Sequence, residues 1–547
     1  MTQVSGGRTV EEMTQTVGQV ETARMLLGDE AVALGAIDAG VSAAYAYPGT
    51  PSTEIMETIL RAAPPGVVAS WTANEKTAYE SALGVSMADR RALVAMKHVG
   101  LNVAADPFIN SALVDIAGGL VVAVADDPGM HSSQNEQDSR HLADFARIVC
   151  LEPASSQEAY DMAREAFEVS ERFRVPVLLR LVTRIAHGRS PVERAPAILG
   201  RPASKAANRA NWTLLPSNAR RLWRDLLLRQ DEMTAWSDRR AVLNLSDDDH
   251  GLGVITTGIA RNHYLENLSD LGFTPSHLHV PAYPVPREAV RRLADSVDRI
   301  LVLEEGYPFV ERALAGLLPT RWSVLGRRSG TVPADGELTP DTVRRALGLP
   351  ERPRVPIDIT LPARPPQLCK GCPHHDSFAV VLGAIDGLED AVVTADIGCY
   401  TLGALPPYEA IESCVCMGAS IGMARGASDA GLRPALAVIG DSTFLHSGVT
   451  PLMDAVAVDA DMTVLILDND TVGMTGQQDT LLPGSRLEPI IAGLGVDPAH
   501  LHVVEMTAKA VDDLTELLRK EMAHPGLSVI VAAKECVEAL KDRRRRS

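Results

Sequence analysis

Two stretches of this 547-residue chain decide its fold: residues 437–443, which read AVIGDST, and residues 462–469, which read MTVLILDN. Each is an apolar run of strand length that ends in polar residues, at Asp441 in the first and at Asn469 in the second. In open parallel sheets, ligands bind at the carboxyl ends of the strands. The two stretches therefore predict parallel strands with a ligand site at their ends.

A metal-bound diphosphate suits the side chains at this edge. A hard cation that bridges two phosphates prefers oxygen ligands in near-octahedral geometry. The Asp441 carboxylate, the Asn469 amide oxygen and the backbone carbonyl of Thr471 are three candidate ligands for Mg²⁺. Backbone amides of the turn 440–443 can point at the phosphates, as in other helix-starting turns. The alternative is a generic strand-to-loop turn in which Asp441 caps a helix.

Alternating strand and helix patterns extend over the remainder of the chain and predict doubly wound α/β units. The predicted strands are residues 43–47, 92–96, 120–125, 175–181, 391–395, 435–439, 462–467 and 527–532, and helical spacing covers 30–39 and 75–87. The expected fold is α/β, with two doubly wound parallel-sheet domains and a smaller α/β middle domain. The predicted boundaries are a flexible N-terminus (1–22), the first domain (23–190), a connector with some helix (191–250), the middle domain (251–349), a Pro-rich linker (350–366) and the last domain (367–547).

Composition excludes several classes of protein. The formal net charge of -18 makes DNA and RNA unlikely partners. The chain has no apolar run long enough to span a membrane and no signal-peptide core, so we expect a cytoplasmic protein. Seven cysteines in such a chain argue against a disulfide framework and favour metal or cluster ligation.

A buried carboxyl group is predicted near residue 75. The segment 71–80 reads WTANEKTAYE, and Glu75 opens a helix whose apolar face follows it. A carboxyl group in an apolar pocket acquires a raised pKa and can act as a general acid. The alternative is that Glu75 only favours the positive end of the helix. Glu80 is a candidate for a surface charge.

Other polar residues follow predicted strands in the first domain. The segment 45–53 reads YAYPGTPST, in which Thr50 could bind a substrate or could cap a helix in a Pro-fixed loop. Lys97 and His98 end another strand, and His131 lies in the loop after a third. These three could line a substrate pocket, although each one alone is more often structural.

Four cysteines are candidates for a shared inorganic site. Cys369 and Cys372 form a C-x-x-C pair that could bind zinc, take part in redox exchange or do nothing. Zinc would require a second close pair, and Cys414 with Cys416 gives only the weaker C-x-C; we leave these two and Cys150 unassigned. Four thiolates suit a [4Fe-4S] cluster, and the two more distant candidates are Cys399 and Cys536.

Taken together, these segments resemble the large subunits of indolepyruvate:ferredoxin oxidoreductases, within the 2-oxoacid:ferredoxin oxidoreductase superfamily. Gly440, Asp441 and Ser442 match the Gly-Asp-Gly start of the thiamine-diphosphate motif in part, because Ser442 replaces a glycine. The ending Asn-Asn is Asp468-Asn469 here, and the run 473–477, GMTGQ, resembles the Gly-Met-Thr-Gly run of the superfamily. The resemblance covers nearly the whole chain from residue 26 to 536, with long matching runs at 74–76, 96–102, 131–138, 396–402 and 417–423.

The resemblance implies roles for single residues. Glu75 would activate thiamine diphosphate, Thr50 would meet the substrate carboxylate, and His98 would lie in the catalytic site. The cofactor contacts would be made by Gly440, Asp441, Ser442, Thr443, Asn469, Thr471 and Met474, besides Glu75. Cys369, Cys372, Cys399 and Cys536 match the order of ligands that hold the [4Fe-4S] cluster nearest thiamine.

The implied reaction is oxidative decarboxylation of an aryl 2-oxo acid, such as indolepyruvate, to an acyl-CoA and CO₂. Electrons would pass through the cluster to ferredoxin, with coenzyme A as the acyl acceptor. The implied partners are a small beta subunit and a second copy of this chain, in a larger hetero-oligomer in which surfaces of the first and last domains meet at the cofactor.

One departure leaves alternatives open. Family large subunits usually continue into a ferredoxin-like domain with two C-x-x-C-x-x-C-x-x-x-C-P runs, and this sequence has none. Electrons would then leave from the single cluster, through a separate ferredoxin, or not at all. The alternatives are a non-oxidative thiamine-diphosphate decarboxylase or carboligase and a catalytically silent subunit.

Overall fold

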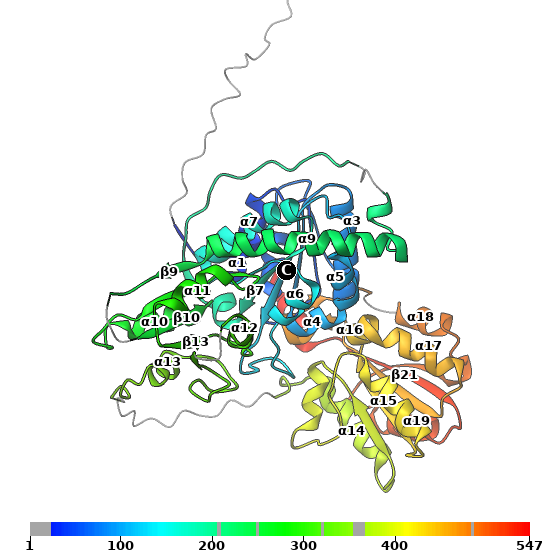
Figure 1. The fold of residues 1–547 in the computed structure, drawn as a ribbon. Helices are drawn as coiled ribbons and strands as arrows, with labels where there is room; N and C mark the ends of the chain where they lie inside the picture. Colours follow the sequence, from blue (N-terminus) through cyan, green and yellow to red (C-terminus); the bar gives the residue numbers. More distant parts are fainter. Residues whose placement is uncertain are drawn as a thin grey trace, which may run out of the picture. The chain divides into compact units, whose positions relative to one another are not determined.

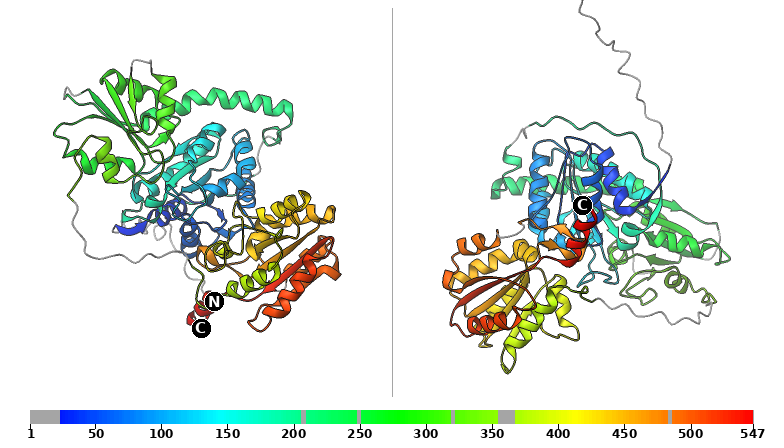
Figure 2. Two further views of the ribbon diagram at one scale, coloured as in Figure 1. Left: turned by 90° about the horizontal axis from the view of Figure 1, so that it is seen from below. Right: turned by 180° about the vertical axis from the view of Figure 1, so that it is seen from behind.

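The computed structural model describes residues 23–204, 209–247, 251–318, 322–353, 367–482 and 486–546. Contacts divide the chain into two compact units: residues 1–71 with 75–353, and residues 72–74 with 354–547. Figures 1 and 2 show the first unit in blue to green and the second in yellow-green to red. The predicted N-terminal segment 1–22 and most of the predicted linker 350–366 lie outside the described residues.

A seven-stranded sheet forms the core of the first unit, and all its neighbouring strands are parallel except the edge pair β12–β6. Its strand order is β12 (Ala282–Tyr283), β6 (Cys150–Leu151), β7 (Val177–Val182), β5 (Leu120–Asp126), β4 (Ala92–Lys97), β2 (Ala43–Ala46) and β3 (Val68–Trp71). Every residue of β5 and β7 is buried. Such near-continuous apolar strands are typical of parallel sheets that are covered on both faces.

Helices connect these strands. They are α1 (Gly28–Asp38), α2 (Thr53–Ala62), α3 (Glu75–Met87), α4 (His98–Val103), α5 (Ala105–Ser111), α6 (Arg140–Ala146), α7 (Ser156–Phe173) and the shorter α8 (Thr183–His187). Helices α1 and α7 pack closely because Gly35 has no side chain: an added Cβ would lie 2.5 Å from the carbonyl oxygen of Tyr160. Strand β1 (Arg24–Leu27) pairs antiparallel with β8 (Arg189–Val192).

A second, five-stranded sheet belongs to the same unit. Its order is β14 (Ser323–Leu325), β13 (Arg299–Leu303), β10 (Leu252–Thr257), β11 (Ser276–Val280) and β9 (Val242–Asn244). Strand β9 is antiparallel to β11, whereas the other pairs are parallel. The accompanying helices are α9 (Pro216–Arg240), α10 (Ala260–Leu268), α11 (Arg287–Asp295), α12 (Phe309–Leu317) and α13 (Pro340–Ala346).

The second unit contains a five-stranded, fully parallel sheet. Its order is β15 (Val392–Ala395), β16 (Ala435–Gly440), β17 (Met462–Asp468), β21 (Leu527–Ala533) and β20 (Leu501–Glu505), and β18 (Thr471–Val472) pairs with β19 (Gln478–Asp479) beside it. Its helices are α14 (His374–Ile385), α15 (Ala419–Asp429), α16 (Asp441–Thr443), α17 (Val449–Ala457), α18 (Leu487–Gly493), α19 (Val511–Met522) and α20 (Val537–Arg546). In the described part of the chain, no helix combines the length and apolarity needed to cross a bilayer.

The two sheets of the first unit are joined by buried charges. We call the following residues the buried ion-pair network: Asp126, Asp138, Arg140, Glu152, Arg180, Tyr283 and Glu304. Arg180 on β7 donates to Asp126 at 2.7 Å and to Glu152 at 2.6 Å. Arg140 donates to Asp138 at 2.5 Å and to Glu304, which follows β13, at 3.0 Å. The network therefore ties the carboxyl ends of the first sheet to the end of the second.

Burial and ion pairing shift the pKa values of the network's carboxyl groups in opposite directions. Burial raises the pKa of Asp126 and of Glu304. Burial alone would also raise that of Asp138, but the guanidinium groups of Arg140 and Arg180 lower its pKa. Both arginines are fully buried, so removing either one leaves carboxylates without their counter-charge.

We predict that Arg180→Met lowers the free energy of unfolding by about 3–5 kcal/mol, because the buried Asp126 then loses its arginine partner and Glu152 keeps the longer, 3.7 Å ion pair with Arg140. Denaturant unfolding of the full chain measures the loss. The matched control is Arg172→Met, which removes an exposed pair with Glu232 and should cost less than about 1 kcal/mol. Equal losses in the two variants would contradict the structural role of the network.

Candidate functional site

Glu75 is the first residue of α3, and its side chain is buried. Space for it exists because residue 100 in α4 is a glycine. A Cβ added at Gly100 would lie 2.5 Å from Oε1 of Glu75 and 2.7 Å from its Cγ. The chain therefore holds a carboxyl group in a fitted pocket at the position predicted for the activating acid.

Lys97, the last residue of β4, lies in the same neighbourhood. Its Nζ donates to the carbonyl of Ser132 at 3.0 Å, and its methylene groups pack against Gly49, where an added Cβ would lie 3.1 Å from Cδ. Burial lowers the pKa of Lys97 to about 8, against the opposing effect of the Asp127 and Glu75 carboxylates. An ammonium group of this kind can bind an anion and can lose its charge in the physiological range.

Hydrogen bonds between hydroxyl side chains and the backbone hold the loop that contains Thr50. The amide of Gly49 donates to Oγ1 of Thr53 at 3.1 Å, and Oγ of Ser52 donates to the carbonyl of Gly49 at 2.8 Å. The hydroxyl of Ser132 donates to the carbonyl of Thr50 at 3.3 Å. Ser132 thus connects Thr50 with Lys97, and the structure brings Thr50, Lys97 and Glu75 into one region of the first unit.

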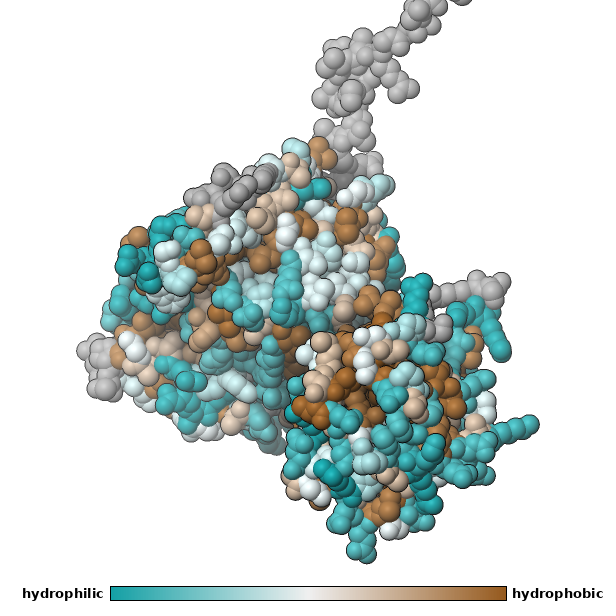
Figure 3. Space-filling model, turned by 90° about the vertical axis from the view of Figure 1, so that its right-hand side faces the viewer, coloured by the Kyte–Doolittle hydropathy of each residue, from teal (hydrophilic) through white to brown (hydrophobic). Residues whose placement is uncertain are grey.

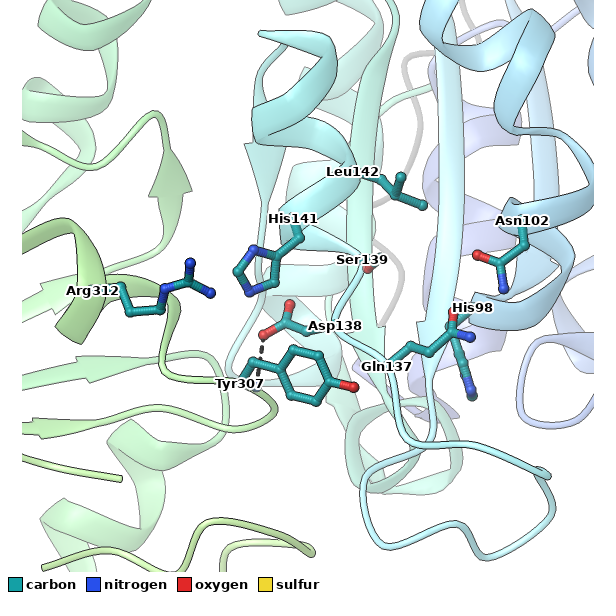
Figure 4. Close-up of a pocket in the computed structure, with 9 residues that line it drawn as sticks. All are labelled: His98, Asn102, Gln137, Asp138, Ser139, His141, Leu142, Tyr307 and Arg312. Carbon is teal, nitrogen blue, oxygen red and sulfur yellow. Dashed lines mark hydrogen bonds between the residues drawn. The ribbon is translucent and has the colours of Figure 1, made fainter. Parts of the chain in front are cut away.

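His98, also predicted as a site residue, faces a separate cavity of about 290 Å³. Its Nε2 bonds with the carbonyl of Asn135 at 2.9 Å, and its Nδ1 has no hydrogen-bond partner among the described residues. Figure 4 shows Arg312 pointing toward His141 across the cavity and the amide of Tyr307 donating to Asp138. The lining includes His98, Asn102, Gln137, His141, Tyr307 and Arg312. His131 lies in the loop that follows β5, and its Nε2 is 3.7 Å from Oε2 of Glu337.

The second unit places Asp441 directly after β16, as predicted. The side chain is buried, and Oδ2 has no hydrogen-bond partner among the described residues. Burial and the nearby carboxylate of Asp468 raise the pKa of Asp441 to about 8. The pKa of Asp468 is also raised by burial. Two acids in this environment repel each other, so the donor set fits a divalent cation that would neutralise them.

The other predicted cofactor residues lie at the end of β16 and in the segments that follow β17. Asn469 follows β17, and its Oδ1 accepts the amide of Thr471 at 3.1 Å. The hydroxyl of Ser442 is buried without a hydrogen-bond partner in the described structure, while Thr443 donates to the carbonyl of Ile397 at 2.9 Å. Gly440 packs against Tyr400, with 2.8 Å from an added Cβ to the ring. Met474 is 52% exposed and lies in the turn that follows β18.

The four predicted cluster cysteines all lie in the second unit, near enough for their charges to act on one another, but the described residues do not bring their sulfur atoms together into a clear cluster site. Burial, and then the charges of Cys372, Cys536 and Cys369, raise the pKa of the Cys399 thiol to about 12. The amide of Cys536 donates to the carbonyl of Asn469 at 3.1 Å, and Sγ of Cys399 lies 3.3 Å from a Cβ built on Gly473. The thiols therefore adjoin the predicted metal loop. Cys150 is buried in the first unit, and Cys414 and Cys416 are exposed.

Two known protein families match parts of the chain. The family "Thiamine pyrophosphate enzyme, C-terminal TPP binding domain" matches residues 396–532. The family "Pyruvate flavodoxin/ferredoxin oxidoreductase, thiamine diP-bdg" matches residues 34–218. Among solved structures, a 2-oxoglutarate:ferredoxin oxidoreductase from Magnetococcus marinus is 14% identical, with a TM-score of 0.49 over 60% of this chain and 66% of that chain.

Relatives match over almost the full chain. The indolepyruvate oxidoreductase subunit IorA of Archaeoglobus fulgidus is 37% identical over 95% of this chain and 88% of its own length. The subunits of the same name from Methanothermobacter thermautotrophicus and Pyrococcus abyssi are 36% and 34% identical, each over 94% of this chain and over 86% and 85% of their own lengths. This chain belongs to the IorA family.

Membership in the IorA family confirms the predicted family, the thiamine-diphosphate-binding α/β fold and the enzyme class, an oxidoreductase. The two matching families also confirm that thiamine diphosphate is the cofactor to expect. Magnesium, the iron-sulfur cluster and the roles of single residues stay predictions.

Sequence reasoning missed two features of the site in this IorA chain. Gly100 lies within the matching run 96–102. Its contact with Glu75, however, joins residues 25 positions apart, and no local sequence pattern predicts such a contact. Asp441, Asp468 and Asp470 form an acidic group. Its only sign in the sequence was Asp468, which replaces the first asparagine of the Asn-Asn that ends the thiamine-diphosphate motif. Adjacent acids at the end of an apolar strand are the signal that could have identified it.

We predict that Gly100→Ala reduces turnover of the aryl 2-oxo acid about 100-fold, since the new methyl group displaces the Glu75 carboxylate. Thiamine diphosphate affinity should change much less. Steady-state kinetics and a cofactor titration separate the two effects. Gly84→Ala in α3 is the matched control: its added Cβ meets no atom within 4 Å, and activity should be retained. Full activity of Gly100→Ala would contradict the fitted pocket.

Proposed function

We propose that this IorA-family chain catalyses oxidative decarboxylation of an aryl 2-oxo acid such as indolepyruvate. The balanced reaction converts RCO–COO⁻ and CoA–SH into RCO–S–CoA, CO₂, one proton and two electrons. The 37% identity with an indolepyruvate oxidoreductase subunit over 95% of the chain carries the proposal. Retention of Glu75 in a fitted pocket and of Asp441 with an unpartnered buried oxygen supports a working site rather than a silent subunit.

The chain's own residues bind and orient the reactants. Asp441, Asn469 and the carbonyl of Thr471 would hold Mg²⁺, and the turn Gly440–Thr443 with Met474 would contact the diphosphate. Glu75 would hold a proton at the aminopyrimidine ring. Thiamine diphosphate, when bound, supplies the nucleophilic carbon and the electron sink that decarboxylation needs. Thr50 and the Lys97 ammonium would bind the substrate carboxylate, and His98 would act from the neighbouring cavity.

The two electrons require a one-electron acceptor. Cys369, Cys372, Cys399 and Cys536 would hold one [4Fe-4S] cluster. Its support is the mutual electrostatic influence of these thiols and the hydrogen bond that links Cys536 to Asn469. When bound by these cysteines, a cluster would supply the one-electron chemistry that transfer to ferredoxin needs.

We also propose partners, a compartment and a domain organisation. A small beta subunit, coenzyme A and ferredoxin would complete the enzyme, with two copies of this chain in the assembly, acting in the cytoplasm. Apolar side chains gather on the surface seen in Figure 3. Exposed apolar residues of the second unit include Val415, Met423, Met453 and Val458, which would suit an interface. The domains predicted at 23–190, 251–349 and 367–547 remain our proposed boundaries.

Iron and acid-labile sulfide content tests the function most directly. Anaerobically reconstituted protein should contain about four of each per chain. Cys399→Ser should lower both severely, whereas Cys414→Ser, an exposed cysteine outside the proposed set, should leave them unchanged. Iron and sulfide near zero in the wild type would instead favour a non-oxidative thiamine-diphosphate enzyme on the same fold.

We predict that kcat/KM falls as the pH rises through about 8, because Lys97 is positively charged below its pKa and neutral above it. Lys97→Arg should move this fall to higher pH, since a guanidinium keeps its charge. Lys97→Met should lower kcat/KM at pH 7 and abolish the fall. An unchanged pH profile in Lys97→Met would exclude Lys97 from substrate binding.

A further inference from the structure

Three potential metal ligands converge in the first unit, beside the loop that contains Thr50. They are Asp29 in the first turn of α1, Glu54 in the first turn of α2 and His187 at the end of α8. One ligand atom from each lies within 4.8 Å of the other two. Nε2 of His187 and Oε2 of Glu54 are 3.5 Å apart.

Asp29 gives this cluster its unusual character. The residue is 0% exposed, and neither carboxylate oxygen has a hydrogen-bond partner among the described residues. A buried carboxylate without hydrogen bonds is costly, so such groups are paired, protonated or bound to a metal. Oε2 of Glu54 differs from the Asp29 oxygens, because it faces Nε2 of His187 at 3.5 Å and this imidazole lowers the pKa of Glu54.

The packing of the helices holds the three side chains together. Gly28 lies so close to α8 that an added Cβ would be 2.1 Å from the carbonyl oxygen of Ile185. This contact sets the start of α1 against the helix that ends in His187. Helix α1 also packs against α2, which positions Glu54. Helix packing therefore fixes the backbone positions from which the three side chains extend.

The charges around the cluster favour a cation. Glu30 adds a further carboxylate beside Asp29, with its Oε2 accepting the amide of Leu27 at 2.9 Å. Glu54 and the charge of Asp127 raise the pKa of His187. The three ligands therefore lie in a region of negative charge. The side chains of Glu54 and His187 are 35% and 36% exposed, so an ion and its water ligands can enter.

We propose that Asp29, Glu54 and His187 bind one divalent transition-metal ion, with Zn²⁺ as the ion that best fits one imidazole and two carboxylates. Three protein ligands and a water complete the tetrahedral set that Zn²⁺ prefers. The ion would join the starts of α1 and α2 to the end of α8. Glu54 follows the loop 49–53, so the ion would also fix the base of the loop that contains Thr50.

The test compares zinc binding by full-length wild type, Asp29→Asn, Glu54→Gln and the control Glu57→Gln, all without thiamine diphosphate. Glu57 lies three residues further along α2 and is not among the three ligands. Cysteines also bind zinc, but all four proteins contain the same seven, so a difference between them belongs to the cluster. Equilibrium dialysis gives the stoichiometry and thermal unfolding gives the stabilisation.

We expect wild type and Glu57→Gln to bind one equivalent of Zn²⁺ more than Asp29→Asn and Glu54→Gln. Saturating zinc should raise the Tm of the first two by about 3–5 °C more than that of the other two. Equal stoichiometry and equal Tm shifts in all four proteins would overturn the proposal. In that case Asp29 is a protonated carboxyl group, and Asp29→Asn should be at least as stable as wild type. An equal shift with Mg²⁺ would also count against a transition-metal site. Glu54→Gln, at a partly exposed position, keeps the comparison valid if Asp29→Asn does not fold.

Discussion

Two fully buried arginines, Arg140 and Arg180, supply the interactions on which the first unit depends. Moving a guanidinium group out of water costs several kcal/mol unless carboxylates and carbonyls surround it. Both arginines meet this condition by binding Asp126 and Asp138, which stand at the two ends of the loop 127–137. These ion pairs therefore hold both ends of the loop in place. Ser132 within it binds Lys97 and Thr50, so the arrangement of the predicted substrate residues follows from buried ion pairs several residues away.

The second unit uses charge in the opposite way. Among the residues that the structure describes there, no cationic side chain pairs with Asp441, and burial raises the pKa values of Asp441 and Asp468. The buried ion-pair network of the first unit pairs its carboxylates with arginines, whereas the sheet of the second unit leaves Oδ2 of Asp441 without a hydrogen-bond partner among the described residues. A fold that leaves negative charge uncompensated at the carboxyl ends of its strands is prepared for a cation and the phosphates that accompany it.

Much of the fold followed from local patterns. The strands β2, β4, β5, β16, β17 and β21 are continuous apolar runs, and each lies within two residues of its predicted position. Strands β9 and β12 were missed because they are two or three residues long and exist only through pairing with distant partners. Arg180 was a readable signal, since an arginine within the apolar strand 177–182 requires a buried counter-charge. The fit of Glu75 to Gly100 and the meeting of Asp29 with His187 depend on tertiary packing, and no sequence spacing encodes them.

Strand β12 restricts motion between the two large sheets of the first unit. It follows β11 of the second sheet in the chain but pairs antiparallel with β6 at the edge of the first sheet. The buried ion-pair network connects the same two sheets. Backbone and charge thus cross-link the two sheets at separate points. Hinge rotation between them would break hydrogen bonds and expose paired charges together, so the first unit should behave as one rigid frame. Any opening that admits a substrate must then come from short loops such as 49–53 and 127–137.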